Sequence, residues 1–332
     1  MSQKVPIITD LKEGQSVSAP FIIDNVCPKT TKQGEPFFFA ELKNASGKIS
    51  AVCWEPDGCV TPAQNGEIVF IVGTVGSYNG QPQLRIESVE LVSPGEINED
   101  LLDALVPSAP IDPAEYANTL ENLVFSIRDE DIREICNFVL FYKYKEEFAV
   151  YPAAKTVHHA CRHGLLMHSV DMARMADTMS SLKPDSFNRD LLVAGALLHD
   201  VGKVLEFEVS PTTGLVVDYS NDGKLLGHSV LGAQEIEAAA GTVDARPEVT
   251  QLLKHMVLAH HGDPSCGAAK EPMTIEAELL HDLDLLDSRR EIYEESLSNT
   301  PSGDHSTKIY ALGHTIYNHQ VAASAADQKG EV

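Results

Sequence analysis

Short apolar segments alternate with turn residues along the first part of the chain. Between about residues 15 and 92 the breaks are rich in Gly, Asn and Pro, and the segments carry β-branched and aromatic residues. This pattern favours short strands joined by tight turns. The predicted strands are FIIDNVC, PFFFAELKN, GKISAVCWE, GEIVFIVGTVGSY and QPQLRIESVELV.

Five short strands in so few residues predict a compact all-β domain, which we assign to residues 1–95. A small closed barrel of the OB type is one common solution. A small sandwich gives a similar pattern, so periodicity alone leaves both open.

The hydrophobic pattern changes after this domain. The segment SPGEINEDLLDALVPSAPIDPA is rich in proline and has no sustained apolar period, so residues 96–115 are predicted to be a linker. Across residues 116–297 apolar residues recur every three to four positions, which predicts an all-α second domain. To residues 298–332 the pattern assigns only a C-terminal tail.

Composition places the chain among ordinary globular proteins, with 43% hydrophobic and 22% charged residues. It contains no apolar stretch of about 18 residues, and its first residues do not resemble a secretory signal. The six cysteines form no CxxC pair, which argues against a zinc ribbon and a disulfide scaffold. We therefore expect a cytoplasmic protein that does not associate with membranes.

The net charge of −24 is unevenly distributed. Residues 1–95 hold 7 Lys/Arg against 10 Asp/Glu, which leaves most of the negative charge in the later part. Nucleic-acid-binding proteins usually gain affinity by neutralising phosphates with Lys and Arg, so the acidic charge alone does not indicate such a partner. Bound divalent cations would offset part of it.

His199 and Asp200 stand side by side at the end of the apolar helix pattern LLVAGALLHD. Two neighbouring metal-capable side chains at a helix end can reach one ion or two adjacent ions. Gly202 lets the chain turn directly afterwards, and Lys203 adds a cation beside the site. A single HD pair is weak evidence by itself.

Further metal-capable residues interrupt the following apolar helix patterns. Each of them, taken alone, is most simply a hydrogen-bonded core histidine or a surface carboxylate. Several on successive helices instead favour a metal site, because one ion satisfies many buried polar groups. The residues are His168, His228, His260, His261 and Asp284.

The order H…HD…H…HH…D resembles the two-metal form of the HD superfamily of metal-dependent phosphohydrolases. The resemblance implies that one ion is bound by His168, His199, Asp200 and Asp284. It implies a second ion bound by His228, His260 and His261, with Asp200 bridging the two. Imidazole and carboxylate ligands suit Mn, Fe, Co, Ni or Zn, and Mg is a further candidate. Asp200 and Lys203 are the predicted catalytic residues, with Lys203 contacting a phosphate oxygen or protonating the leaving group.

Two further segments are similar to the YhaM-type 3′–5′ exoribonucleases, which join an OB fold to an HD domain. One is PAAK followed by His158 and His159, and the other runs from AHHG to DLDLLDSR. The barrel segments KQGEPFFFAELKNASGKISAVCWEPD and YNGQPQLRIESVELV also resemble that family. The resemblance implies hydrolysis of single-stranded RNA, with single-stranded DNA as a second substrate, to nucleoside monophosphates. It further implies Mn²⁺ as the activating ion, a homo-oligomer, and substrate contacts from Lys155, His158 and His159.

The barrel is the predicted holder of the nucleic-acid strand. Exposed aromatic side chains on strands can stack against bases, each contributing about 1–3 kcal/mol. The alternation along PFFFAEL turns some of its aromatics toward the core, and Trp54 is by residue type more often buried than exposed. The candidates are Phe37, Phe39, Trp54 and Tyr78 for stacking, and Lys32, Lys48 and Arg85 for phosphates.

Two other interpretations remain open at this point. An HD phosphohydrolase acting on small cyclic or linear nucleotides would use the barrel as a regulatory module. A non-catalytic binding protein would have kept the barrel and lost turnover, against which the intact set of metal-capable residues argues. The preferred prediction, ahead of these two, is a metal-dependent phosphodiesterase that shortens single-stranded nucleic acid.

Overall fold

The computed structural model describes residues 5–54, 65–155 and 159–321. The chain divides after His281 into two compact units, residues 1–281 and 282–332. The first unit contains a barrel and most of the helices, and the second begins within the last helix. His158 lies outside the described residues, so its predicted substrate contact stays a prediction.

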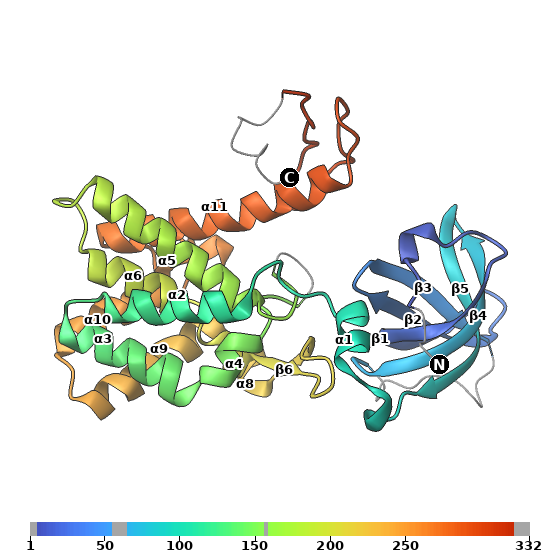
Figure 1. The fold of residues 1–332 in the computed structure, drawn as a ribbon, viewed down its shortest axis with the longest axis horizontal. Helices are drawn as coiled ribbons and strands as arrows, with labels where there is room; N and C mark the ends of the chain where they lie inside the picture. Colours follow the sequence, from blue (N-terminus) through green and yellow to red (C-terminus); the bar gives the residue numbers. More distant parts are fainter. Residues whose placement is uncertain (1–4, 55–64, 156–158, 322–332) are drawn as a thin grey trace, which may run out of the picture. The chain divides into compact units, whose positions relative to one another are not determined.

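A closed five-stranded barrel forms the N-terminal domain, with strand order β1-β2-β3-β5-β4 (Figure 1). The β3 and β5 strands pair in parallel, and every other neighbouring pair is antiparallel. Closure removes exposed sheet edges, as in OB-type barrels. The strands are β1 (Ser16–Thr30), β2 (Pro36–Asn44), β3 (Gly47–Cys53), β4 (Ile68–Tyr78) and β5 (Gln81–Leu91), preceded by the short 3-10 helix η1 (Ile8–Asp10).

Local sequence explains the turns of the barrel. Asn79 and Gly80 both have positive φ, which is the requirement of the tight hairpin turn joining β4 to β5. Gly73 lies at a register shift in β4, where an added Cβ would meet the carbonyl oxygen of Arg85 at 2.3 Å. A side chain at Gly73 would therefore push the two strands apart.

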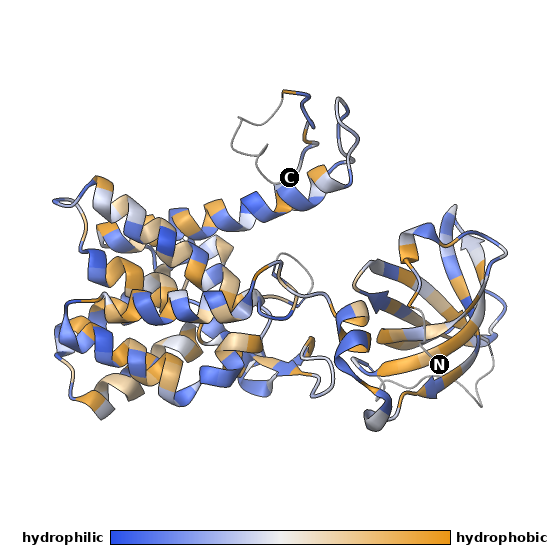
Figure 2. Ribbon diagram, viewed as in Figure 1, coloured by the Kyte–Doolittle hydropathy of each residue, from blue (hydrophilic) through white to orange (hydrophobic). Residues whose placement is uncertain are grey.

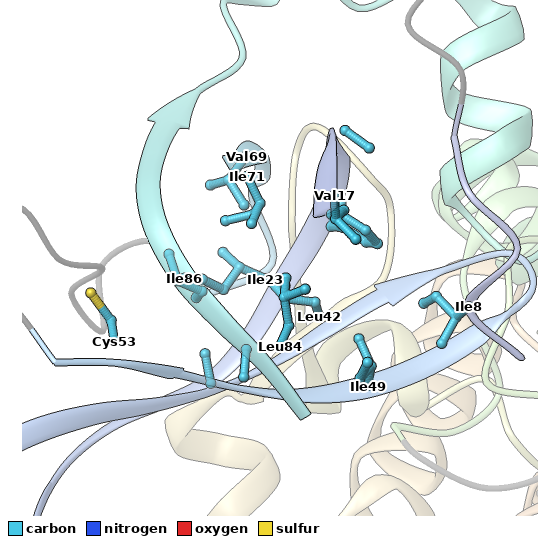
Figure 3. Packing of buried hydrophobic residues seen from close by; sticks show 14 of the residues in the cluster. Ile8, Val17, Ile23, Leu42, Ile49, Cys53, Val69, Ile71, Leu84 and Ile86 are labelled. Atoms are coloured by element: carbon cyan, nitrogen blue, oxygen red, sulfur yellow. The ribbon is translucent and has the colours of Figure 1, made fainter. Parts of the chain in front are cut away.

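Alternate residues of the strands fill the barrel with hydrocarbon. Ile23, Leu42 and Leu84 come from three strands and point toward one another in the interior (Figure 3). All three are fully buried. Burial of such side chains contributes roughly 1.5–3 kcal/mol each, which makes this interior the main source of the barrel's stability.

The 3-10 helix η4 (Pro94–Glu96) ends where the predicted linker begins, and the linker itself contains the short helix α1 (Glu99–Leu105). The α1 helix buries Leu105 in a small cluster with Ile22 and Ile68 of the barrel. Part of this segment therefore packs on the barrel.

Helices carrying both hydrophilic and hydrophobic residues make up the next part of the chain (Figure 2). Asn188 begins one of them by accepting hydrogen bonds from the backbone of Asp190 and Leu191, and every residue from Leu191 to Leu198 is buried. The first helices are α2 (Pro113–Phe125), α3 (Glu130–Asn137), the π-helical turn η5 (Phe138–Lys143), α4 (Lys145–Val150), α5 (Gly164–Leu182) and α6 (Arg189–Leu198). The later ones are α7 (Lys203–Glu206), α8 (Asn221–Leu226), α9 (His228–Val243), α10 (Pro247–Ala259), the 3-10 helix η6 (Pro264–Cys266) and α11 (Ile275–Ser298).

The prediction of an all-helical second domain misses one antiparallel hairpin. Strands β6 (Phe207–Val209) and β7 (Val216–Tyr219) pair around the turn sequence PTTG. Their aromatic and β-branched residues favour strands, and the segment is too short to establish a period. Along the chain, the hairpin lies between the HD pair and helix α9, which begins at His228.

Three smaller features complete the description. Residues 303–318 of the second unit fold back on themselves, with a backbone hydrogen bond from Ser306 to Ile316. Cys53 at the end of β3 is disulfide-bonded, a bond that the cysteine spacing did not predict. Across the described ranges, every helix is too short or too polar to span a bilayer.

Candidate metal centre

The HD pair lies where the buried helix α6 ends. His199 and Asp200 are 0% and 2% exposed. The Nδ1–H of His199 donates to the carbonyl oxygen of Ala196 at 2.9 Å, which leaves Nε2 facing Asp200. The side chain is thus held in one orientation by the last turn of its own helix.

Gly202 brings the start of α9 against the HD turn. A Cβ at Gly202 would lie 2.0 Å from the carbonyl oxygen of His228 and 2.6 Å from the nitrogen of Gly232. The two backbones touch because there is no side chain between them. This contact places His228, the first residue of α9, beside Asp200.

The two oxygens of Asp200 face two different pairs of histidines. Oδ1 lies 3.6 Å from Nε2 of His228 and 3.9 Å from Nε2 of His260. Oδ2 lies 3.3 Å from Nε2 of His199 and 3.7 Å from Nε2 of His168. A carboxylate with imidazole nitrogens on both sides has the arrangement needed to bridge two cations.

Asp200 and the histidines around it form a largely buried cluster. Within the described part of the chain, three polar atoms of this cluster are buried and make no hydrogen bond. They are Oδ1 of Asp200, Nε2 of His228 and Nε2 of His260. Leaving a buried polar atom unsatisfied costs about 1–3 kcal/mol. The ligand atoms of His228, His260 and His261 also lie within 4.8 Å of one another. This donor set therefore fits a divalent cation.

The pKa shifts of Asp200 and His260 favour the deprotonated forms, which are the forms that bind a metal ion. Burial opposes ionisation of Asp200, but the Lys203 ammonium and His199 hold the pKa of Asp200 well below its usual range. Burial, together with the neighbouring His199 and His261, holds the pKa of His260 well below its usual value. Asp200 is thus a carboxylate and His260 a neutral imidazole at neutral pH, as ligation requires.

The remaining predicted residues of the site lie in different places. Lys203 forms an ion pair with Oδ2 of Asp200 at 2.5 Å. His159 is buried, has a positive φ, and its ring centroid lies 4.9 Å from that of His168. Lys155 lies 3.7 Å from Asp218 and over the ring of Tyr219. Their contacts with a substrate stay predictions.

Asp284 lies on α11, within the unit that begins at residue 282. Its membership of the ligand set stays a prediction from the motif. His281, the last residue of the first unit, donates from Nδ1 to the carbonyl oxygen of His260 at 2.9 Å. Its ring also fills the space beside Gly262, where a Cβ would meet Nε2 at 2.5 Å. His281 thus fixes the turn that follows the paired histidines.

Two residues important for this geometry were missed by the motif. One is His281, and the other is Glu206, which binds the ring and backbone of His228. Neither belongs to the H…HD…H…HH…D pattern. For Glu206, the signal available in the sequence was an acidic residue inside the otherwise apolar run VLEF, three residues after Lys203.

The aromatic candidates lie on the outer face of the barrel. Phe37 stacks on Trp54 with 4.8 Å between ring centroids, and Trp54 is 42% exposed rather than buried. Phe38, between the two candidates of β2, is the aromatic that packs on the core. Phe39 carries the Lys29 ammonium 4.0 Å from its ring centroid.

The polar candidates of the barrel are also exposed. The register places Phe39 opposite Val52 and Val52 opposite Arg85, so Arg85 belongs to the same outer face as Phe39. Lys32 lies in the turn between β1 and β2, and Tyr78 is 63% exposed at the end of β4. Lys48, a further phosphate candidate, is exposed and pairs with Glu41 at 3.7 Å.

Comparison with known families agrees with both parts of the fold. The HD domain matches residues 165–289, and the OB-fold nucleic acid binding domain matches residues 23–92. A barrel of this type followed by a helical domain with a buried histidine–aspartate cluster defines an OB-HD protein.

Curated relatives extend over nearly the whole chain. The 3′–5′ exoribonuclease YhaM of Listeria welshimeri is 32% identical over 315 residues, which cover 94% of this chain and 97% of the relative. That of Geobacillus sp. (strain WCH70) is 32% identical over 327 residues, which cover 97% of each. The chain therefore belongs to the YhaM family.

Proposed function

We propose that this protein is a metal-dependent 3′–5′ exoribonuclease that hydrolyses single-stranded RNA to nucleoside monophosphates. The observation that carries the proposal is the position of Asp200, whose two oxygens face separate pairs of histidines. The relatives named as 3′–5′ exoribonucleases support the reaction and its direction. We propose RNA as the preferred strand and DNA as the weaker substrate.

The ligand assignment follows the two sides of Asp200. We assign His168, His199 and Asp284 to one ion, His228, His260 and His261 to the other, and Asp200 to both. The distances around Asp200 and the grouping of His228, His260 and His261 support it. Nitrogen and oxygen ligands without thiolate favour Mn, Fe, Co, Ni or Zn, and we propose Mn²⁺.

Bound at these ligands, two divalent cations supply an activated water at neutral pH and stabilise the charge that develops on the phosphate. The chain provides the rest. Asp200 stays ionised and His260 stays neutral, so neither ligand has to lose a proton before a cation binds. Lys203, held beside Asp200, is placed to contact a phosphate oxygen or to protonate the leaving oxygen.

The substrate strand extends onto the barrel in this proposal. The exposed Trp54 and the half-buried Phe37 and Phe39 offer aromatic surface for stacking, and Arg85 adds a cation on the same face. The strand 2–3 face of an OB barrel is where such folds bind oligonucleotides. Tyr78, Lys32, Lys155, His158 and His159 are further proposed contacts. The homo-oligomer expected from the family resemblance is likewise a proposal.

A substrate panel tests the proposal. Purified protein is loaded with Mn²⁺ and given RNA and DNA single strands labelled at the 5′ or the 3′ end, bis(p-nitrophenyl) phosphate, and cyclic and linear nucleotides. The expected result is a ladder of shortened products from 5′-labelled RNA and immediate release of labelled mononucleotide from 3′-labelled RNA. Turnover of a small nucleotide and the generic ester with no shortening of any oligonucleotide would instead identify a nucleotide phosphohydrolase.

A further inference from the structure

Glu206 is a buried carboxylate that the ligand set does not use. It is the last residue of α7 and is 7% exposed. Acidic residues are rarely buried unless they have a partner. Its partner is His228: Oε1 accepts from the backbone N–H of His228 at 3.1 Å, and Oε2 lies 3.1 Å from Nδ1 of the ring.

The packing around Glu206 leaves this carboxylate little freedom. Its carbonyl oxygen accepts from the backbone of Ser220 at 2.8 Å, just before α8. Gly223 of α8 lies so close that a Cβ there would be 2.4 Å from that same oxygen and 3.0 Å from Cγ of Glu206. Gly227, with φ +76°, then turns the chain into α9 at His228. The segment from β6 to α8 thus folds around Glu206 and places His228 in contact with the Glu206 carboxylate.

The contact determines which nitrogen of His228 is available. A carboxylate can only accept, so Nδ1 carries the hydrogen in this pair. Nε2 of the neutral ring then keeps its lone pair, and it lies 3.6 Å from Oδ1 of Asp200. That separation is too long for a hydrogen bond, whereas atoms that share one ion at about 2.0–2.2 Å each lie at comparable separations.

His228 differs in this respect from two other histidines of the cluster. The Nδ1 atoms of His199 and His260 are directed to the backbone carbonyls of Ala196 and Val257. A hydrogen bond to a carboxylate is charge-assisted and makes the imidazole a stronger ligand. Of these three histidines, His228 is the one with a charged anchor, and it lies on the side of Oδ1 of Asp200.

We propose that Glu206 is a positioning residue that orients His228 and selects its Nδ1–H tautomer for the second metal ion. The inference rests on the proposed two-metal site. Glu206 touches neither ion nor substrate and acts through His228.

The test compares Glu206→Gln with Glu208→Gln, which removes the same charge two residues later at an exposed position of β6. The E206Q side chain would keep the size of the original but present an amide N–H toward Nδ1, which favours the opposite tautomer. Chelator-stripped proteins are titrated with MnCl₂ by calorimetry, and histidine tautomers are assigned in the metal-free proteins by long-range ¹H–¹⁵N NMR. The expected result for E206Q is a roughly 10–100-fold loss of affinity at one of two sites, with Nε2–H in His228. E208Q should match the wild type.

Glu206→Asp keeps the carboxylate one methylene shorter and should recover the Nδ1–H tautomer and part of the lost affinity. His228→Ala should weaken the same site, and E206Q should add nothing in that background. The proposal is overturned if E206Q keeps the wild-type tautomer, if it weakens both sites equally with a matching drop in thermal stability, or if E206D binds no better than E206Q. Wild-type protein that takes up fewer than two Mn²⁺ contradicts the two-metal site itself, and the tautomer comparison then still decides the role of Glu206.

Discussion

The Nε2 atoms of His168 and His199 lie 3.1 Å apart, one on α5 and the other just after α6. The Nδ1–H of His199 already donates to a backbone carbonyl, so its Nε2 in the neutral ring is an acceptor. Oδ2 of Asp200 lies beside both nitrogens. Three electron-pair donors, one on α5 and two in the turn after α6, thus converge at a position where one cation could bind all three.

Replacing Asp200 by Asn should remove both ions, because each of its oxygens faces one half of the cluster. Loss of affinity at each site should exceed the roughly 10–100-fold that follows loss of an outer hydrogen-bond partner. Exonuclease activity should fall to background. The measurement is metal content after dialysis, with Asp222→Asn on the exposed face of α8 as control. Retention of one tightly bound ion in D200N would rule out the bridging role.

Gly202→Ala should disrupt the site without replacing any ligand side chain. The new methyl group would meet the backbone of His228 and Gly232, so α9 must move away from the HD turn. We expect a loss of about 1–3 kcal/mol in the free energy of unfolding and weaker Mn²⁺ binding.

The matched control for that variant is Gly241→Ala on α9, where no atom lies within 4 Å of the added Cβ. It should be neutral or stabilise by roughly 0.5–1 kcal/mol, because alanine favours the helix over glycine. The measurement is the free energy of unfolding of the metal-free proteins by chemical denaturation. Equal stability of G202A and the wild type would show that the close backbone contact is not needed.

The sequence indicated residues that the structure brings together around Asp200, but it did not reveal the partners that orient them. His199 and His260 stand out because a polar residue interrupts an apolar helix pattern. Glu206 and His281 act through hydrogen bonds to residues far away in the sequence, and such pairs have no characteristic spacing. Trp54 is exposed because it lies just beyond β3 on the outer face, a position that residue type alone does not reveal.

Removing the aromatic ring of Trp54 should weaken binding of long strands. The loss of one base stack, about 1–3 kcal/mol, corresponds to a roughly five- to 150-fold rise in KM for single-stranded RNA. Hydrolysis of bis(p-nitrophenyl) phosphate should not change in W54A, because this small ester carries no base that could stack on Trp54. Phe125→Ala, at another exposed aromatic position on α2, serves as control. A proportional loss on both substrates would argue against the barrel as the strand holder.

The pH dependence of stability should include a contribution from His255 on α10. Burial, together with the nearby Lys270, lowers the pKa of His255, and its Nε2 accepts the backbone N–H of Met273 at 2.9 Å. Above its ordinary pKa of 6.5 the ring is neutral in both states and this contribution is fully present. As pH falls below that value, the unfolded chain takes up the proton first, so the contribution is lost.

His255→Gln keeps an acceptor for Met273 and does not titrate. Thermal melts of metal-free protein should therefore show the wild type losing stability relative to H255Q between about pH 6.5 and pH 5. Parallel curves for the two proteins across that range would show that His255 does not contribute.

The central claim is that Asp200 bridges two metal ions. Anomalous diffraction from Mn²⁺-soaked crystals measures this directly. We predict two peaks about 3.5–4 Å apart, one contacting Oδ1 of Asp200 with His228, His260 and His261, and the other contacting Oδ2 with His168, His199 and Asp284. A single peak, or peaks that do not contact Asp200, would contradict the account.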